Sequence, residues 1–241
     1  MPLVLQRFLR KRVEAALHDP SQRFHLAWPT ILGAPRLREL HPEGVPEAEL
    51  FAHAAKMLGA LGIHDPAEAW AASRAAFPDT AEQGATGWRP HPDWGGHGPL
   101  ISLRSGWQLA ALTPLPVDGL YGLACGVSLF NHGLYHECHD ALEPLWIEAR
   151  DPLKNGLQGL ILMTAGYHHL QLQNAKGMQA VWEDSLARLE PFTGRVETPW
   201  GAVDFAEAAR ITEGRLTLLD GEAGWPALWR MDRPLWTLEN L

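Results

Sequence analysis

Hydrophobic residues after Trp107 recur at the spacing of an α-helix, and only short turn sequences interrupt them. Helices are predicted over residues 118–129, 131–149, 154–173, 177–189 and 204–219. No segment of useful length alternates between apolar and polar residues as a β-strand does. Because short turns make neighbouring helices antiparallel, the fold class is predicted to be all-α, with a bundle of antiparallel helices in the C-terminal half.

Composition divides the rest of the chain into further parts. Residues 1–77 are predicted to form an N-terminal helical extension. Residues 78–106 are dense in glycine and proline and have no helical period, so we predict a long irregular loop or a linker. The helical bundle is assigned to residues 107–220. The tail, residues 221–241, is interrupted by proline and is expected to pack on the core through its tryptophans.

The balance of charges bears on the possible partners. Twenty Lys and Arg residues against 28 Asp and Glu residues give a net charge of −8, whereas a non-specific nucleic-acid-binding protein normally has a basic face. No apolar run approaches the length of a transmembrane helix, and the N-terminus lacks the apolar core of a signal peptide. We therefore expect a cytoplasmic protein with no nucleic-acid and no membrane partner; a homo-oligomer is possible. Cys125 and Cys138 fall on apolar helix positions and are expected to be buried free thiols.

One stretch, FNHGLYHECHDALEPLW, concentrates polar residues on a predicted helix. At about 100° per residue, one stripe of the helix 131–149 holds histidines, a carboxylate and a tryptophan: His132, His136, His139, Glu143 and Trp146. A separate stripe is apolar, and Glu137 and Asp140 point in a third direction, where we expect water. Asn131 is predicted to cap the N-terminus of this helix.

The next predicted helix adds polar residues to the same region. Since the two helices are antiparallel, the C-terminal end of the second lies beside the N-terminal end of the first. This arrangement places His168 and His169 level with His136, and Gln158 nearer to Glu143 and Trp146.

The pattern FNxGxYxxxHDxxExxW, followed by GLQGLI, a tyrosine–histidine pair and an Asn-Ala-Lys-Gly turn, resembles the uncharacterised family called domain of unknown function 309. The resemblance covers about residues 120–190. The family's hallmark, His-x3-Glu-x2-Trp, is matched by His139, Glu143 and Trp146, while Asp140 stands where members commonly have glutamate. The resemblance implies an all-helical fold, and because the family's activity is unknown it implies no mechanism.

Imidazole and carboxylate groups on one helix face are typical of a metal site. His136, His139 and Glu143 could bind one divalent ion, with His168 as a further donor, and this ligand set suits zinc, iron, nickel or manganese. A bound ion lowers the pKa of a water molecule, and Glu143 or Asp140 would then serve as ligand or catalytic base. This interpretation predicts a metal-dependent hydrolase.

Two other interpretations stay open, neither of which needs a cofactor. The His–Glu pair can be a structural polar network buried by Trp146, in a non-catalytic helical module that binds a ligand or a partner protein. The same region can also form a metal-free pocket for an unknown small molecule, with candidate ligand-binding residues Trp146, Tyr135, Asn131 and Gln158.

Overall fold

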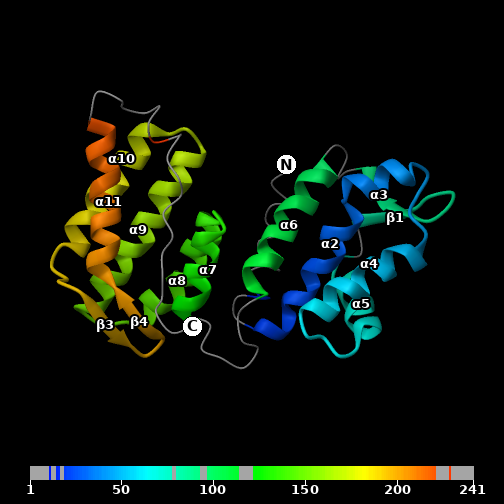
Figure 1. Cartoon of the computed structure of the whole chain (residues 1–241), viewed down its shortest axis with the longest axis horizontal. Coiled ribbons are helices and arrows are strands. Elements are labelled where there is room, and N and C mark those ends of the chain that lie inside the picture. The colour runs from blue at the N-terminus through cyan, green and yellow to red at the C-terminus, as the bar shows by residue number, and fades with distance from the viewer. Residues whose placement is uncertain are drawn as a thin grey trace. The chain divides into compact units, whose positions relative to one another are not determined.

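The computed structural model describes residues 11, 15–16, 19–77, 80–92, 97–113, 122–220 and 228. Helices predominate in these residues, and the sheets among them are two small antiparallel hairpins, so the prediction of a helical fold is confirmed. The contacts divide the chain into two compact units, residues 1–118 and residues 119–241 (Figure 1). None of the helices in the described ranges is both long enough and apolar enough to cross a membrane.

The first unit consists of short helices and one hairpin. Its elements are η1 (Pro20–Leu26), α2 (Ala27–Leu32), α3 (Pro35–Leu40), α4 (Glu47–Ala60), α5 (Pro66–Ala75), β1 (Ala81–Gln83), β2 (Trp88–Pro90) and α6 (Gly98–Leu112). Helix α2 contacts η1, α4, α5, α6 and β2, and it buries Trp28, Ile31 and Leu32. Residues 19–77 therefore belong to a unit with its own core, and the description as an extension is too simple.

The prediction that residues 78–106 are irregular is wrong for the part of this segment that the structure describes. Strands β1 and β2 pair in antiparallel fashion, and α6 begins at Gly98. Trp88 also exchanges two backbone hydrogen bonds of 2.8 and 2.9 Å with Val45. Gly87 permits this close approach, because a Cβ atom there would lie 2.1 Å from the carbonyl oxygen of Val45. Glycine here marks backbone packing against a distant segment.

Helix α6 belongs to the first unit, although residues 107–112 are predicted to be part of the bundle. It packs on α2 and η1. The buried guanidinium of Arg23 donates hydrogen bonds of 3.0 and 3.1 Å to the carbonyl oxygens of Leu112 and Leu61. Pro99 occupies the first turn of α6, where the missing N–H of proline costs no helical hydrogen bond. A glycine- and proline-rich sequence therefore begins a helix at this point.

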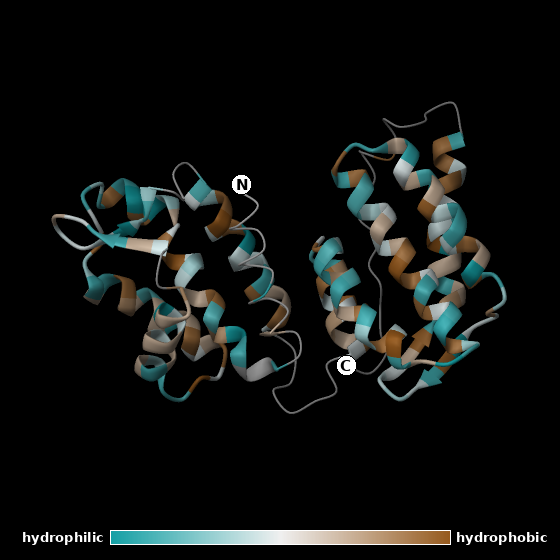
Figure 2. Cartoon of the chain, turned by 180° about the vertical axis from the view of Figure 1, so that it is seen from behind, coloured by the Kyte–Doolittle hydropathy of each residue, from teal (hydrophilic) through white to brown (hydrophobic). Residues whose placement is uncertain are grey.

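The second unit is the predicted bundle (Figure 1). Its elements are α7 (Gly122–Asn131), α8 (Tyr135–Glu148), α9 (Leu153–Gln171), α10 (Ala175–Leu189), β3 (Arg195–Thr198), β4 (Gly201–Asp204) and α11 (Phe205–Asp220). Helix α9 packs on α8, α10 and α11. Leu157, Leu160 and Met163 of α9 are fully buried, as is Trp182 of α10. Figure 2 shows polar and apolar residues interspersed along these helices, as expected for helices that each bury one face.

The helix predicted over residues 131–149 begins later than expected. Gly133 has a φ of 70°, and the N–H groups of Gly133 and Leu134 donate to carbonyl groups in the last turn of α7. This pair of hydrogen bonds is a Schellman motif, which ends a helix. Asn131 is consequently the last residue of α7, so the prediction that it caps the next helix is wrong. Helix α8 starts at Tyr135.

The predicted packing of the tail through its tryptophans lies outside the described residues. Leu228 is the one residue of the segment 221–241 that the structure describes, and its side chain is buried.

Candidate metal centre

Two imidazoles and one carboxylate converge on helix α8. The Nδ1 atom of His139 lies 3.3 Å from Oδ1 of Asp140, and the Nδ1 atom of His136 lies 3.7 Å from the same oxygen. One possible ligand atom from each of the three residues lies within 4.8 Å of the others. The spacing of three and four residues from His136 accounts for the convergence, because such residues are neighbours on a helix surface.

The carboxylate of this group is buried and the imidazoles are partly open to solvent. The side chain of Asp140 is 7% exposed, compared with 40% for His136 and 34% for His139. The expectation that Asp140 and Glu137 face water is wrong, since Glu137 is buried as well. Both residues lie next to the apolar stripe on a helix that packs against α7 and α9, and this packing removes them from solvent.

A third imidazole reaches the group from α9. The ring centroids of His136 and His168 are 5.3 Å apart, and those of His136 and His139 are 6.3 Å apart. The antiparallel arrangement of α8 and α9 thus brings His168 to the position that the sequence indicates. His169 lies elsewhere, with its Nδ1 atom 3.2 Å from Nδ2 of Asn174.

Glu143 does not belong to the convergent group. Its side chain is exposed, and the three residues whose ligand atoms meet are His136, His139 and Asp140. Glu143 precedes the buried Leu145 by two residues, which is roughly 160° around the helix, so it points away from the core. The predicted pocket shared by His139 and Glu143 is therefore not the arrangement that the structure shows.

The tryptophan of the family motif lies at the C-terminal end of α8. Trp146 is half-buried, and the Nζ atom of Lys154 lies 4.9 Å from its ring centroid. Its Nε1 atom is buried and has no hydrogen-bond partner among the described residues. A cation over the ring contributes about 0.5–2 kcal/mol in other proteins, so Lys154 helps to fix this side chain.

The other residues predicted to bind a ligand do not meet at this point. The Oε1 atom of Gln158 accepts a hydrogen bond of 3.1 Å from Arg188 of α10, so Gln158 faces α10. Tyr135 is buried in an aromatic cluster, with its ring centroid 5.0 Å from that of Tyr167. Asn131 ends α7. The candidate centre consists of His136, His139 and Asp140, with His168 adjacent.

Residues 123–181 match the family model of DUF309, a domain of unknown function. This chain carries a DUF309 domain. The match covers most of α7, all of α8 and α9 and the start of α10, so it contains the whole candidate metal centre. The family that the sequence resembles is therefore confirmed, and its description assigns no activity. No curated protein and no solved structure matches the chain.

The second unit has a buried polar contact between α9 and α11 that the sequence analysis did not predict. The hydroxyl oxygen of Tyr167 accepts a hydrogen bond of 3.2 Å from Nε of Arg215, and both residues are buried. Burial raises the pKa of Tyr167 to about 12 despite this guanidinium. Cys125 and Cys138 are free and buried, as predicted, and burial raises the pKa of both thiols.

Proposed function

We propose that the DUF309 domain of this chain binds a divalent transition-metal ion through His136, His139 and Asp140 and uses it to activate a water molecule for hydrolysis. The observation that carries the proposal is the convergence of three ligand side chains at one point of α8. Two imidazoles and a carboxylate with an open position form the ligand type of catalytic zinc sites.

The distances support ion binding better than a simple hydrogen bond. Imidazole nitrogen and carboxylate oxygen lie roughly 2.0–2.2 Å from zinc, which places two ligands of a tetrahedral ion roughly 3.4 Å apart. The two distances to Oδ1 of Asp140, 3.3 and 3.7 Å, are close to this value. Strong charge-assisted hydrogen bonds between nitrogen and oxygen are shorter, about 2.7–2.9 Å.

The partial exposure of the two imidazoles supports a metal site that substrate and water can reach. The imidazoles of His136 and His139 are partly exposed, whereas the Asp140 carboxylate beneath them is held by the packed helix. His168, from a second helix, lies beside His136, with ring centroids 5.3 Å apart, so it adds an imidazole next to the open position. Imidazole and carboxylate ligands suit zinc, iron, nickel and manganese.

A general base near the ion accelerates hydrolysis, because it accepts the proton of the attacking water. A divalent ion lowers the pKa of a bound water to about 7. Glu143 is exposed and follows His139 by one helical turn, so the two residues are neighbours on the surface of α8. We assign to Glu143 the role of the base that accepts the proton of this water, and to Asp140 the role of a ligand.

A second candidate function is the non-catalytic helical module. It is favoured by one observation, the 3.3 Å contact in which His139 and Asp140 can share a hydrogen bond without any ion. In such a module the cluster stabilises the fold. Removal of a histidine would then destabilise the protein, because a buried carboxylate would lose a partner.

Zinc titration of the full chain, purified without a metal-affinity tag, tests the proposal. We expect about one zinc ion per chain, with binding lost in His139→Ala and Asp140→Asn. His132→Ala is the matched control, because His132 is exposed on the turn before α8 and bonds through Nδ1 to the carbonyl of Ser128. Binding that is absent in the wild type, or equal in Asp140→Asn and His132→Ala, would exclude the metal site.

Thermal melting of His136→Ala and His139→Ala separates the two candidates. A functional cluster is kept at some cost in stability, so apoprotein lacking the imidazole of His136 or His139 should melt at the same or a higher temperature than wild type. Marked destabilisation of both variants, with and without a chelator, would instead support the structural network.

A further inference from the structure

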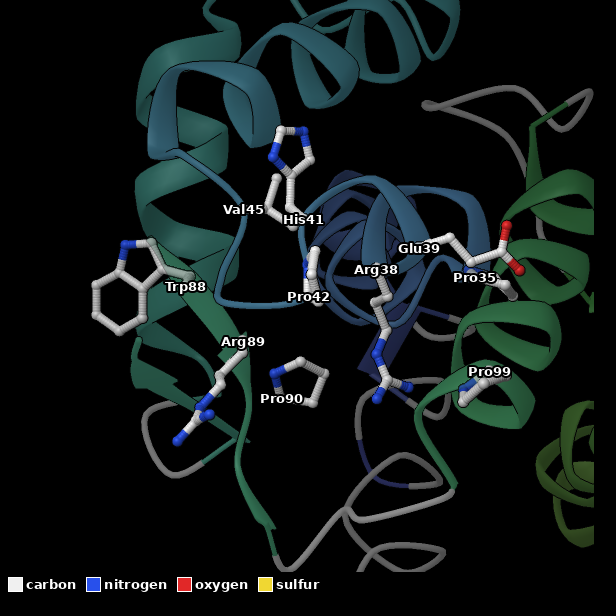
Figure 3. A pocket seen from close by; sticks show the side chains of 10 residues that line it. All are labelled: Pro35, Arg38, Glu39, His41, Pro42, Val45, Trp88, Arg89, Pro90 and Pro99. Carbon is white, nitrogen blue, oxygen red and sulfur yellow. The ribbon is translucent and has the colours of Figure 1, made fainter. Parts of the chain in front are cut away.

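A cavity of about 480 Å³ opens in the first unit, between α3, the residues that follow it, strand β2 and the first turn of α6 (Figure 3). We infer that this cavity is a binding site for a small organic carboxylate, in which Arg38 receives the carboxylate and proline side chains contact the apolar body. The site lies outside the DUF309 domain and does not depend on the metal centre.

The walls of the cavity are mostly apolar. Val45 and four prolines line it, and the prolines come from three separate segments of the chain. These prolines are Pro35, Pro42, Pro90 and Pro99. Proline has no backbone N–H, so these walls offer few donors to a polar ligand. The volume falls within the roughly 300–1,000 Å³ of small-molecule sites, which are mainly apolar with a few placed polar groups.

Arg38 supplies the polar group that would orient a ligand in this cavity. Its guanidinium lies between Pro90 and Pro99 (Figure 3) and makes no ion pair or hydrogen bond with any residue that the structure describes. Gly98 leaves room for it, because a Cβ atom at that position would lie 2.9 Å from Nη1 of Arg38. A partly buried guanidinium without a partner is unfavourable, and an anion in the cavity would supply the missing acceptor.

The start of α6 adds to the positive potential beside Arg38. This helix of 15 residues has no side-chain cap at its N-terminus and no acidic residue in its first turn. The N-terminal end of a helix carries a partial positive charge, so the start of α6 cannot neutralise the positive charge of the Arg38 guanidinium. An anion bound to Arg38 would be stabilised by both groups.

The other charged residues of the cavity already have partners or point away. Arg89 forms an ion pair of 2.6 Å with Glu82, and Nε2 of His41 lies 2.8 Å from Oε2 of Glu49. The carboxylate of Glu39 points away from the guanidinium (Figure 3). Among the described residues that line the cavity, Arg38 is the one cation without an ion-pair partner, and it matches one negative charge. A guanidinium binds a carboxylate through two parallel hydrogen bonds. A phosphate dianion would need a second free cation, so we favour the carboxylate.

Calorimetric titration of the full chain with three probes tests the inference. Phenylacetate presents a carboxylate on an apolar body, phenylacetamide is its neutral counterpart, and inorganic phosphate is an anion without that body. We expect phenylacetate to bind the wild type, and the other two probes to bind at least about tenfold more weakly. No binding of phenylacetate, or equal binding of phosphate, would overturn the assignment.

Substitutions locate the binding. Arg38→Gln should weaken phenylacetate binding about 10- to 100-fold, whereas Arg36→Gln, an exposed arginine of the same helix, should leave it unchanged. Gly98→Ala should also weaken it, since the added methyl group displaces the flexible end of Arg38. Asp140→Asn, which removes the proposed metal ligand, should have no effect. Equal affinity in Arg38→Gln and Arg36→Gln, or loss of binding in Asp140→Asn, would overturn the site.

Discussion

His139 and Asp140 are neighbours in the sequence, and their Nδ1 and Oδ1 atoms lie 3.3 Å apart, whereas Glu143, one turn beyond His139, is exposed. Asp140→Asn should therefore lower zinc affinity at least about tenfold, that is by about 1.4 kcal/mol or more. Glu143→Gln should leave the affinity unchanged. Calorimetric titration with zinc measures both, and a larger loss in Glu143→Gln would show that the family motif, not the convergent group, holds the ion.

Glu143→Gln should act on the reaction instead. Zinc-loaded wild type is expected to hydrolyse p-nitrophenyl acetate or bis(p-nitrophenyl) phosphate, with Glu143 accepting a proton from the bound water. Loss of a general base costs about 100-fold or more in rate. The rate should fall in Glu143→Gln while zinc binding is retained, and the exposed His132→Ala should match wild type. Equal rates in the two variants would remove Glu143 from the mechanism.

Much of the candidate centre could be predicted from local spacing. Helical period places His136 and His139 on one face, and a short turn brings the C-terminal end of α9, with His168, beside them. The burial of Asp140 and the exposure of Glu143 could not be predicted in this way, because a helical wheel gives angles between residues but not which polar face packs against neighbours. The position of Glu143 nearly opposite Leu145 was the available signal.

The errors in the fold have two physical causes. Asn131 resembles an N-cap, yet Gly133 adopts a positive φ and ends α7, so this sequence stops one helix and does not cap the next. The hairpin beside Trp88 depends on pairing with Val45, which is far away in the sequence. Local pattern carries no information about such a partner, and the glycines that permit the contact look like loop residues.

The packing of α9 against α10 depends on the absence of a side chain at Gly166. A Cβ atom there would lie 2.0 Å from Nε1 of Trp182, which is fully buried and donates a hydrogen bond of 3.0 Å to the carbonyl of Met163. Gly166→Ala should lower the free energy of unfolding by about 1–3 kcal/mol or more, measured by urea denaturation.

Gly214→Ala is the matched control for this substitution. Gly214 lies within α11, is exposed, and has no atom within 4 Å of the added Cβ. Alanine there should raise the free energy of unfolding by about 0.5–1 kcal/mol, because glycine loses more backbone freedom on folding. A Gly166→Ala protein as stable as Gly214→Ala would contradict the close packing of α9 on Trp182.

The hydroxyl of Tyr167 should contribute to stability through Arg215. Tyr167→Phe removes the acceptor of a buried guanidinium N–H, so the free energy of unfolding should fall by about 1–3 kcal/mol. Arg210→Gln is the control, because it removes an exposed cation of α11, the helix that carries Arg215, together with its 3.6 Å contact with Glu207. This substitution should change the free energy of unfolding by less than about 1 kcal/mol. Urea denaturation compares the two variants; a Tyr167→Phe protein no less stable than Arg210→Gln would exclude this contribution.

Tyr167 should also make the stability of the protein fall in alkaline solution. Burial raises its pKa from 10.0 to about 12, although the charge of Arg215 and its hydrogen bond act in the opposite direction. Between these values the unfolded chain loses the tyrosine proton while the folded chain keeps it, so the unfolded state binds fewer protons and stability decreases as pH rises. The contribution of Tyr167 to stability is fully present below pH 10 and is lost as pH rises from 10 to 12, and the loss reaches about 2–3 kcal/mol when pH passes 12. In a spectrophotometric titration, wild type should show a tyrosine that ionises near pH 12 and Tyr167→Phe should lack it. The free energy of unfolding should also decline less steeply between pH 10 and 12 in Tyr167→Phe, and identical slopes in the two proteins would show that this phenol does not drive the alkaline loss.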